Sequence, residues 1–164
     1  MRVLFLDVDG VLNRASFQPD DATGLRSWIE PEPAGRLDAV LARTGAHVVM
    51  SSSWRLDHSL DELRAELAAA GIAATVIGAT PALDDQPRWR EIEAWMVAHQ
   101  LAREAIVILD DARDMGALGE RFVRTDPSAG LDDITAAAVI ALFEQPAAAP
   151  ARSPCRPRLG TRTD

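Results

Sequence analysis

Residues 3–12 read VLFLDVDGVL, and this stretch decides the fold. Its four leading apolar residues predict a short buried strand, which is followed directly by Asp7 and Asp9. Because side chains alternate along an extended segment, two aspartates spaced two residues apart emerge on the same side. Gly10 lets the backbone turn behind them, since it has no Cβ. The stretch therefore pairs a candidate nucleophile with a candidate proton donor at the end of a strand.

Strand and helix patterns alternate along the rest of the chain. The predicted strands cover residues 2–7, 47–50, 74–77, 105–109 and 122–124. The predicted helices cover residues 33–44, a segment marked by Leu60, Leu63 and Leu67 that ends at Gly71, a segment from Pro87 to His99, and residues 132–143. Strands separated by helices of this size imply a parallel sheet with right-handed crossovers. We expect an α/β fold, a Rossmann-like three-layer sandwich with a five-stranded parallel sheet and ligands at the carboxyl ends of its strands.

The length and composition fit one domain with an additional tail. Of the 164 residues, 48% are apolar, which suits a single globular core. Residues 1–144 form the predicted catalytic domain, and residues 145–164, rich in Pro, Ala and Arg, are predicted to be disordered. The formal charge of −8 disfavours non-specific binding to nucleic acid over the surface as a whole.

Two residue types are informative because they are rare. All 17 basic residues counted as Lys plus Arg are arginine, which excludes Schiff-base chemistry and any site that requires a lysine ammonium. The single cysteine, Cys155, excludes a disulfide or a thiolate metal site within one chain.

The amino terminus lacks the long apolar region of a signal peptide, and no stretch approaches a membrane span. We expect a cytoplasmic protein without a membrane partner, and the oligomeric state stays open.

The segment Leu4–Asn13 resembles the first motif of the haloacid dehalogenase-like (HAD) hydrolases. Later segments resemble the other three motifs in family order: Ser51–Arg55, Gln86–Ile92 and Ile106–Asp111. Residues 123–126 and 130–131 are also similar to a small subgroup that includes HAD domains associated with RNA repair proteins. The resemblance implies a Mg²⁺-dependent phosphomonoesterase that forms an aspartyl-phosphate intermediate.

The resemblance also implies roles for the aspartates. Asp7 is the nucleophile, and Asp9 protonates the leaving oxygen and later deprotonates the attacking water. The implied Mg²⁺ ligands are the carboxylates of Asp7 and Asp110 and the backbone carbonyl of Asp9, with Asp111 assisting through water. Carboxylates about 4 Å apart repel by roughly 1 kcal/mol in water and about 4 kcal/mol at an effective dielectric constant of 20. A magnesium ion relieves this repulsion and neutralises phosphate charge.

The second and third motifs leave alternatives. A hydroxyl at the end of the second strand donates to a phosphoryl oxygen, and Ser52 is favoured for this role, with Ser51 next. The third motif usually supplies a lysine, which must here be arginine; Arg88 is favoured over Arg90. A guanidinium clamps a phosphoryl group through several donors. Substrate binding is assigned to Ser51, Ser53, Arg55 and Arg90.

The gaps between the motifs bear on the substrate. Residues 13–32 and 56–87 are too short for a cap domain of ordinary size, so we expect an open site that suits a bulky substrate or a phosphate on a chain end. By analogy with the RNA repair subgroup, the phosphorylated substrate is a nucleic-acid end or a nucleotide. Three aromatic residues either stack on a base or belong to the core: Phe17, Trp28 and Trp54.

Three other functional classes compete with a phosphatase. A phosphoacceptor signalling domain also clusters aspartates on a parallel sheet, but it needs a lysine after its last strand, and this chain has none. A halide-releasing enzyme would not need Asp9 together with a metal cluster. A non-catalytic interaction module on the same scaffold predicts the loss of Asp7 or Asp9, and both are present.

Overall fold

The computed structural model describes residues 1–19 and 28–145, so the predicted disordered tail lies outside the described residues except for Gln145. The five strands are β1 (Val3–Leu6), β2 (His47–Met50), β3 (Val76–Ala79), β4 (Ile106–Asp110) and β5 (Phe122–Arg124). The four α-helices are α1 (Pro31–Thr44), α2 (Leu60–Ala69), α3 (Arg88–Ala98) and α4 (Asp133–Glu144). Short 3₁₀-helices, η1 (Ser53–Leu56), η2 (Arg103–Ala105) and η3 (Gly116–Arg121), lie between them.

The strands form one parallel sheet in the order β3-β2-β1-β4-β5. Strand β1 occupies the centre, and its last residue, Leu6, is in register with Met50 of β2 and Leu109 of β4. The residues that follow β1 and β2, and the last residue of β4, therefore lie side by side at the carboxyl edge. The predicted five-stranded parallel sheet is confirmed.

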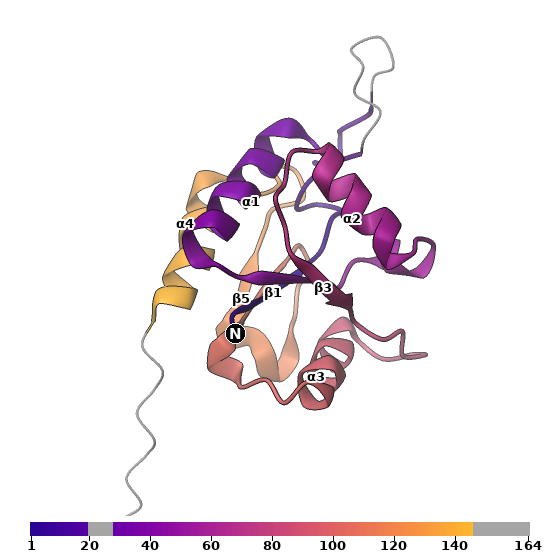
Figure 1. Ribbon diagram of the computed structural model, residues 1–164, viewed down its shortest axis with the longest axis vertical. Helices are drawn as coiled ribbons and strands as arrows, with labels where there is room; N and C mark the ends of the chain where they lie inside the picture. Colours follow the sequence, from indigo (N-terminus) through magenta and orange to yellow (C-terminus); the bar gives the residue numbers. More distant parts are fainter. Residues whose placement is uncertain (20–27, 146–164) are drawn as a thin grey trace, which may run out of the picture.

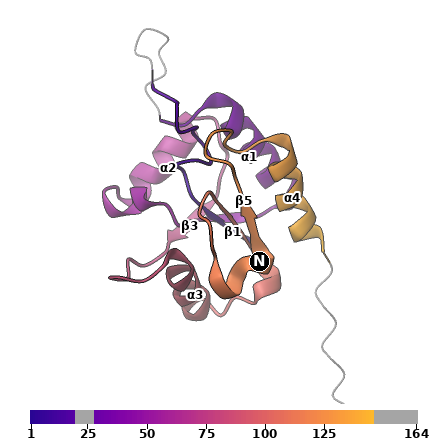
Figure 2. The ribbon, with the colours of Figure 1, turned by 180° about the vertical axis from the view of Figure 1, so that it is seen from behind.

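Helices cover both faces of the sheet, as Figures 1 and 2 show. Helices α1, α2 and α4 pack on one face, where the larger core includes Leu37, Leu67 and Val139. Helix α3 packs on the other face, where Ile92 and Trp95 contribute to a smaller core. This arrangement confirms the Rossmann-like three-layer sandwich.

Local capping sets the individual ends of two helices. Helix α2 begins with a capping box, in which the Ser59 hydroxyl accepts the backbone N–H of Glu62 and the Glu62 carboxylate accepts that of Ser59. Helix α1 ends at Gly45, whose φ of 63° is left-handed and favours glycine. Between β2 and β3 the structure contains only η1 and α2, so this connection holds no cap domain.

The predicted bounds of the third strand are wrong by two residues, since β3 begins at Val76 and not at residue 74. Pairing with β2 decides the register, because Met50 lies opposite Ala79. Gly78 weakens the local strand pattern, but it belongs to β3 because it pairs with Val49 of β2. A Cβ at Gly78 would lie 3.3 Å from the indole nitrogen of Trp95, so glycine leaves room for that ring. Tertiary packing thus overrides local preference here.

No helix in the described ranges is long and apolar enough to cross a membrane.

Candidate functional site

Four polar residues form a row across the carboxyl edge of the sheet: Asp7, Ser51, Thr80 and Asp110. The backbone N–H groups of Asp7, Ser51 and Thr80 donate to carbonyls of neighbouring strands at 2.9–3.0 Å, which extends the register of the sheet by one residue. Side chains in register on parallel strands point to the same face. The row therefore faces the side of the sheet that α3 covers.

Arg88, the first residue of α3, reaches this row. Its Nη1 donates to Asp7 Oδ2 at 2.5 Å and to Asp110 Oδ2 at 2.6 Å. Burial opposes the charge of Arg88, but the two carboxylates outweigh burial and raise the pKa of its guanidinium. Within the described part of the chain, Nε and Nη2 have no hydrogen-bond partner, so these donors are available to a ligand.

Three carboxylates could hold a metal ion. Asp7, Asp110 and Asp111 each offer an oxygen, and these oxygens lie within 4.8 Å of one another. Burial, followed by the charge of Asp7, raises the pKa of both Asp110 and Asp111. An additional cation would offset the burial and the charge repulsion that disfavour the ionised forms of these carboxylates.

The donor set suits Mg²⁺, which prefers carboxylate oxygens and retains water ligands. Gly10 makes the arrangement possible, because its φ is 73° and a Cβ there would lie 2.5 Å from Asp111 Oδ2. Only glycine lets the β1 loop approach Asp111 this closely. The residues present therefore fit a magnesium ion held by oxygen ligands.

Asp9 lies beside this cluster but its side chain makes different contacts. Its Oδ1 accepts a hydrogen bond from Asn13 Nδ2, and its Oδ2 accepts one from Trp54 Nε1, both at 3.1 Å. The Asp9 residue is exposed, whereas Asp7 is 4% exposed and Asp110 fully buried. This geometry suits a group that exchanges protons with a leaving group or water. Metal binding by the Asp9 backbone carbonyl remains a prediction.

The three adjacent serines have different environments. Ser51 occupies the row with Asp7, and its buried Oγ has no hydrogen-bond partner among the described residues. Ser52 Oγ accepts the backbone N–H of Trp54 at 3.3 Å and caps η1. Ser53 is exposed. Because Ser51 is in register with the predicted nucleophile, the geometry favours Ser51 over Ser52 as the phosphoryl-binding hydroxyl, which reverses the preference drawn from the sequence.

Two arginines predicted to bind substrate make other contacts. Arg55 donates to the carbonyls of Ser51, Ser52 and Thr80 and pairs with Glu91 at 2.5 Å, and its side chain is 7% exposed. These contacts place Arg55 inside the protein as a structural link. Arg90 pairs with Glu93 at 2.8 Å and lies over the Trp89 ring, outside the aspartate cluster. Of the two arginines considered for the third motif, the structure brings only Arg88 to Asp7.

Three residues that the sequence reasoning did not assign support the site. Asn13 Oδ1 accepts the backbone N–H of Gly10 at 3.0 Å while its Nδ2 donates to Asp9. Thr125, just after β5, donates its hydroxyl to the Gly10 carbonyl at 2.8 Å. Glu91 orients Arg55. Asn13 follows Asp9 by four residues in a tight loop, and this short spacing could have indicated their contact. The contacts of Thr125 and Glu91 join residues far apart in the chain, so the sequence carries no such signal for them.

Comparison with known proteins agrees with this geometry. The sequence model of one family, described as "HAD domain in Swiss Army Knife RNA repair proteins", matches residues 3–136. A search of curated proteins finds no significant match. The matched region contains every strand and all the residues of the aspartate cluster. The chain therefore belongs to this family of HAD domains, and it has a phosphatase-type hydrolase scaffold.

Proposed function

We propose that the chain is a Mg²⁺-dependent phosphomonoesterase that acts through an aspartyl-phosphate at Asp7. The observation that carries the proposal is the bridge from Arg88 to Asp7 and Asp110. Arg88 lies 81 residues from Asp7 and 22 residues from Asp110 in the chain, yet it hydrogen-bonds to both. The fold thus brings residues of three motifs together around the proposed nucleophile, Asp7. The Nε and Nη2 donors of Arg88, which have no partner in the described part of the chain, remain for phosphoryl oxygens.

The side chains at the site have separate roles in binding the metal ion and the phosphoryl group. Asp7, Asp110 and Asp111 would hold Mg²⁺, which when bound neutralises phosphate charge and orients the phosphoryl group. Arg88 donates to phosphoryl oxygens, and the unpaired Ser51 hydroxyl is an additional donor. These donors are fixed before the substrate arrives, because β-strand register and α3 hold them in place.

The reaction has two steps. In the first, a carboxylate oxygen of Asp7 forms a bond to phosphorus as the bond to the leaving oxygen breaks, and protonated Asp9 gives its proton to that oxygen. In the second, ionised Asp9 takes a proton from a water molecule, whose oxygen attacks phosphorus. The bond between phosphorus and Asp7 then breaks, which releases inorganic phosphate and restores both aspartates.

The proposed substrate is a terminal phosphate on a nucleic acid or a nucleotide. The family description associates these domains with RNA repair proteins. The connection between β2 and β3 holds no cap, so a chain end could reach Asp7 from outside. The formal charge of −8 argues against contact with a long stretch of polyanion and favours recognition of the end alone.

An aryl phosphate assay tests the proposal. We expect Mg²⁺-dependent hydrolysis that chelation abolishes, and we expect Asp7→Asn to be inactive. Asp114→Asn is the matched control, because Asp114 is exposed and lies in the turn after the cluster, where it accepts the Gly116 N–H. Equal activity of Asp7→Asn and the parent protein would contradict the mechanism. A phosphodonor that labels the protein stably without turnover would indicate a phosphoacceptor domain instead.

A further inference from the structure

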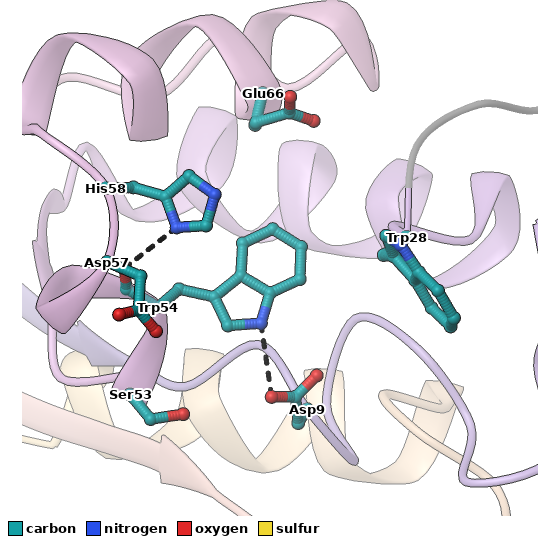
Figure 3. Close-up of a pocket in the computed structure, with 7 residues that line it drawn as sticks. All are labelled: Asp9, Trp28, Ser53, Trp54, Asp57, His58 and Glu66. Carbon is teal, nitrogen blue, oxygen red and sulfur yellow. Dashed lines mark hydrogen bonds between the residues drawn. The ribbon is translucent and has the colours of Figure 1, made fainter.

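A cavity of about 440 Å³ opens beside Asp9, and Arg88 is not among the residues that line it. Figure 3 shows its walls: Trp54 and Ser53 from η1, Asp57 and His58 from the loop that follows, Glu66 from α2, and Trp28 from the segment before α1. Its volume falls within the range of about 300–1,000 Å³ that is typical of small-molecule sites. Phe17 does not line it; this residue borders a different hollow with Trp28.

Both tryptophans of the cavity are connected to Asp9, Trp54 through its indole and Trp28 through its backbone. Trp54 donates its indole N–H to Asp9 Oδ2 at 3.1 Å. The backbone carbonyl of Trp28 accepts Asn13 Nδ2 at 3.0 Å, and the same nitrogen donates to Asp9 Oδ1. Figure 3 shows Asp9 beneath the Trp54 indole, on the side of that ring that faces Trp28. A group between the two indoles would therefore lie next to the proposed acid that protonates the leaving oxygen.

The indoles offer flat apolar surface. Trp28 is 48% exposed, which is high for so large a side chain, and the indole plane of Trp54 is tilted by 31° from the His58 ring at a centroid distance of 5.9 Å. Exposed aromatic faces of this kind bind bases by stacking, with little dependence on sequence. The walls thus favour a planar ring over a sugar or an alkyl chain.

The polar atoms around the cavity are mainly hydrogen-bond acceptors. The carboxylates of Asp57 and Glu66 make no hydrogen bond or ion pair within the described ranges. His58 Nδ1 lies 3.0 Å from the Trp54 carbonyl and must donate to it, which leaves Nε2 of the neutral ring as an acceptor. Acceptors of this kind match exocyclic amino groups, and the two carboxylates repel a second phosphate.

We propose that this cavity binds the terminal base of the substrate, with a preference for bases that carry an amino group: adenine, cytosine and guanine. The base stacks against Trp54 and Trp28 and donates its amino group to Asp57 or Glu66, while the phosphate of the same nucleotide reaches Asp7. This inference rests on the proposed phosphatase function only for the position of the phosphate. Binding of the base alone requires no hydrolysis.

Indole N–H signals in an NMR titration test the inference directly. The chain has four tryptophans, and single Trp→Phe variants assign their signals. We expect adenosine to shift the signals of Trp28 and Trp54 saturably. The signals of Trp95, which stacks on His99 at 3.7 Å, and of Trp89, which lies against Gly116, are built-in controls and should not move. Uridine should bind about threefold to tenfold more weakly, because it lacks an amino group.

Two further comparisons extend the test: a free nucleoside against the end of an oligonucleotide, and a cavity variant against a control variant. Adenosine represents a free nucleotide, and a short unphosphorylated oligonucleotide that ends in adenosine represents a chain end; a shift with either supports the cavity. Trp28→Ala should weaken adenosine binding by about tenfold, whereas Leu56→Ala, an exposed η1 residue outside the cavity, should not.

Three results would overturn the inference: no saturable shift with any amino-bearing nucleoside, equal affinity for uridine, or tighter binding of choline, which would indicate a cation site. These results are independent of catalysis, because nucleosides carry no phosphate. Hydrolysis of aryl phosphate without nucleoside binding would leave the proposed function standing and remove the base site. Nucleoside binding without hydrolysis would leave the base site standing and remove the proposed function.

Discussion

Two arginine–carboxylate clusters lie at the same edge of the sheet, and they differ in how their donors are used. Arg55 directs Nε, Nη1 and Nη2 to backbone carbonyls and to Glu91, so its guanidinium is fully engaged. Arg88 uses Nη1 alone, for Asp7 and Asp110. The first cluster is closed and the second is open. The comparison indicates that a saturated ion pair holds the fold, while an unsaturated one nearby is available for chemistry.

The closed cluster also positions the open one. Glu91 lies three residues after Arg88 on α3, and Arg55 connects it to the carbonyls of Ser51 and Thr80 at the ends of β2 and β3. The link therefore fixes α3 against the carboxyl edge of the sheet. Arg88 can reach Asp7 because this link sets the start of the helix.

The largest expected effect tests the closed cluster. Arg55→Ala should lower the free energy of unfolding by about 3–5 kcal/mol, because it leaves the buried Glu91 carboxylate without its ion-pair partner. Arg43→Ala is the matched control, since the Arg43–Glu144 pair is exposed and should contribute about 0–1 kcal/mol. Urea denaturation measures both. Equal losses in the two variants would mean that burial does not distinguish the pairs.

The next effect tests the open cluster. Arg88→Ala should lower kcat/KM by about 10²–10³-fold, the usual loss when one transition-state donor is removed. Arg90→Ala should have little effect, because that side chain is half exposed and pairs with Glu93. Steady-state kinetics with an aryl phosphate measure the ratio. A loss in Arg90→Ala as large as that in Arg88→Ala would break the distinction between the two arginines.

A smaller effect is expected from the serines. Ser51→Ala should lower kcat/KM by about tenfold to a hundredfold, since a hydrogen bond to a charged group contributes about 1.5–3 kcal/mol. Ser128→Ala should be neutral, because Ser128 is exposed and lies after β5, outside the row. The same assay compares them. A larger loss in Ser52→Ala than in Ser51→Ala would restore the preference drawn from the sequence.

The smallest effect concerns pH. Burial, followed by the charge of Asp7, raises the pKa of Asp110 and Asp111, so their contribution to stability is present at acid pH and is lost as the pH rises through the raised values. Mg²⁺ binds the ionised forms and opposes this loss. Its stabilisation, a few degrees in Tm, should grow as the pH rises. Thermal unfolding with and without Mg²⁺ measures it; the reverse dependence would contradict the metal assignment.

The sequence predicted the parts of the fold that depend on local pattern. The apolar runs before Asp7 and Asp110 predicted two strands that end in carboxylates, and the resemblance to the HAD motifs implied that these ends adjoin. The third strand was misplaced, because Gly78 weakens its pattern and pairing with β2 decides its register. Local signals therefore identify the strands better than they set their bounds.

The candidate site was predictable where motifs carry it and not where tertiary contacts do. Asp7 and Arg88 followed from motif order, but nothing local distinguishes Ser51 from Ser52, which differ only in the face to which they point. Arg55 resembled a substrate ligand because its partner, Glu91, lies 36 residues further along the chain. Such distant pairs have no spacing signature.

Mapping of a trapped phosphoryl group tests the central claim most directly. The protein would be mixed with phosphate-labelled aryl phosphate and Mg²⁺, quenched in acid during turnover, digested, and analysed by mass spectrometry. The open-cluster account predicts a base-labile label on Asp7 that is absent from Asp7→Asn and retained in Asp114→Asn. A label on any other residue, or turnover that continues in Asp7→Asn, would contradict it.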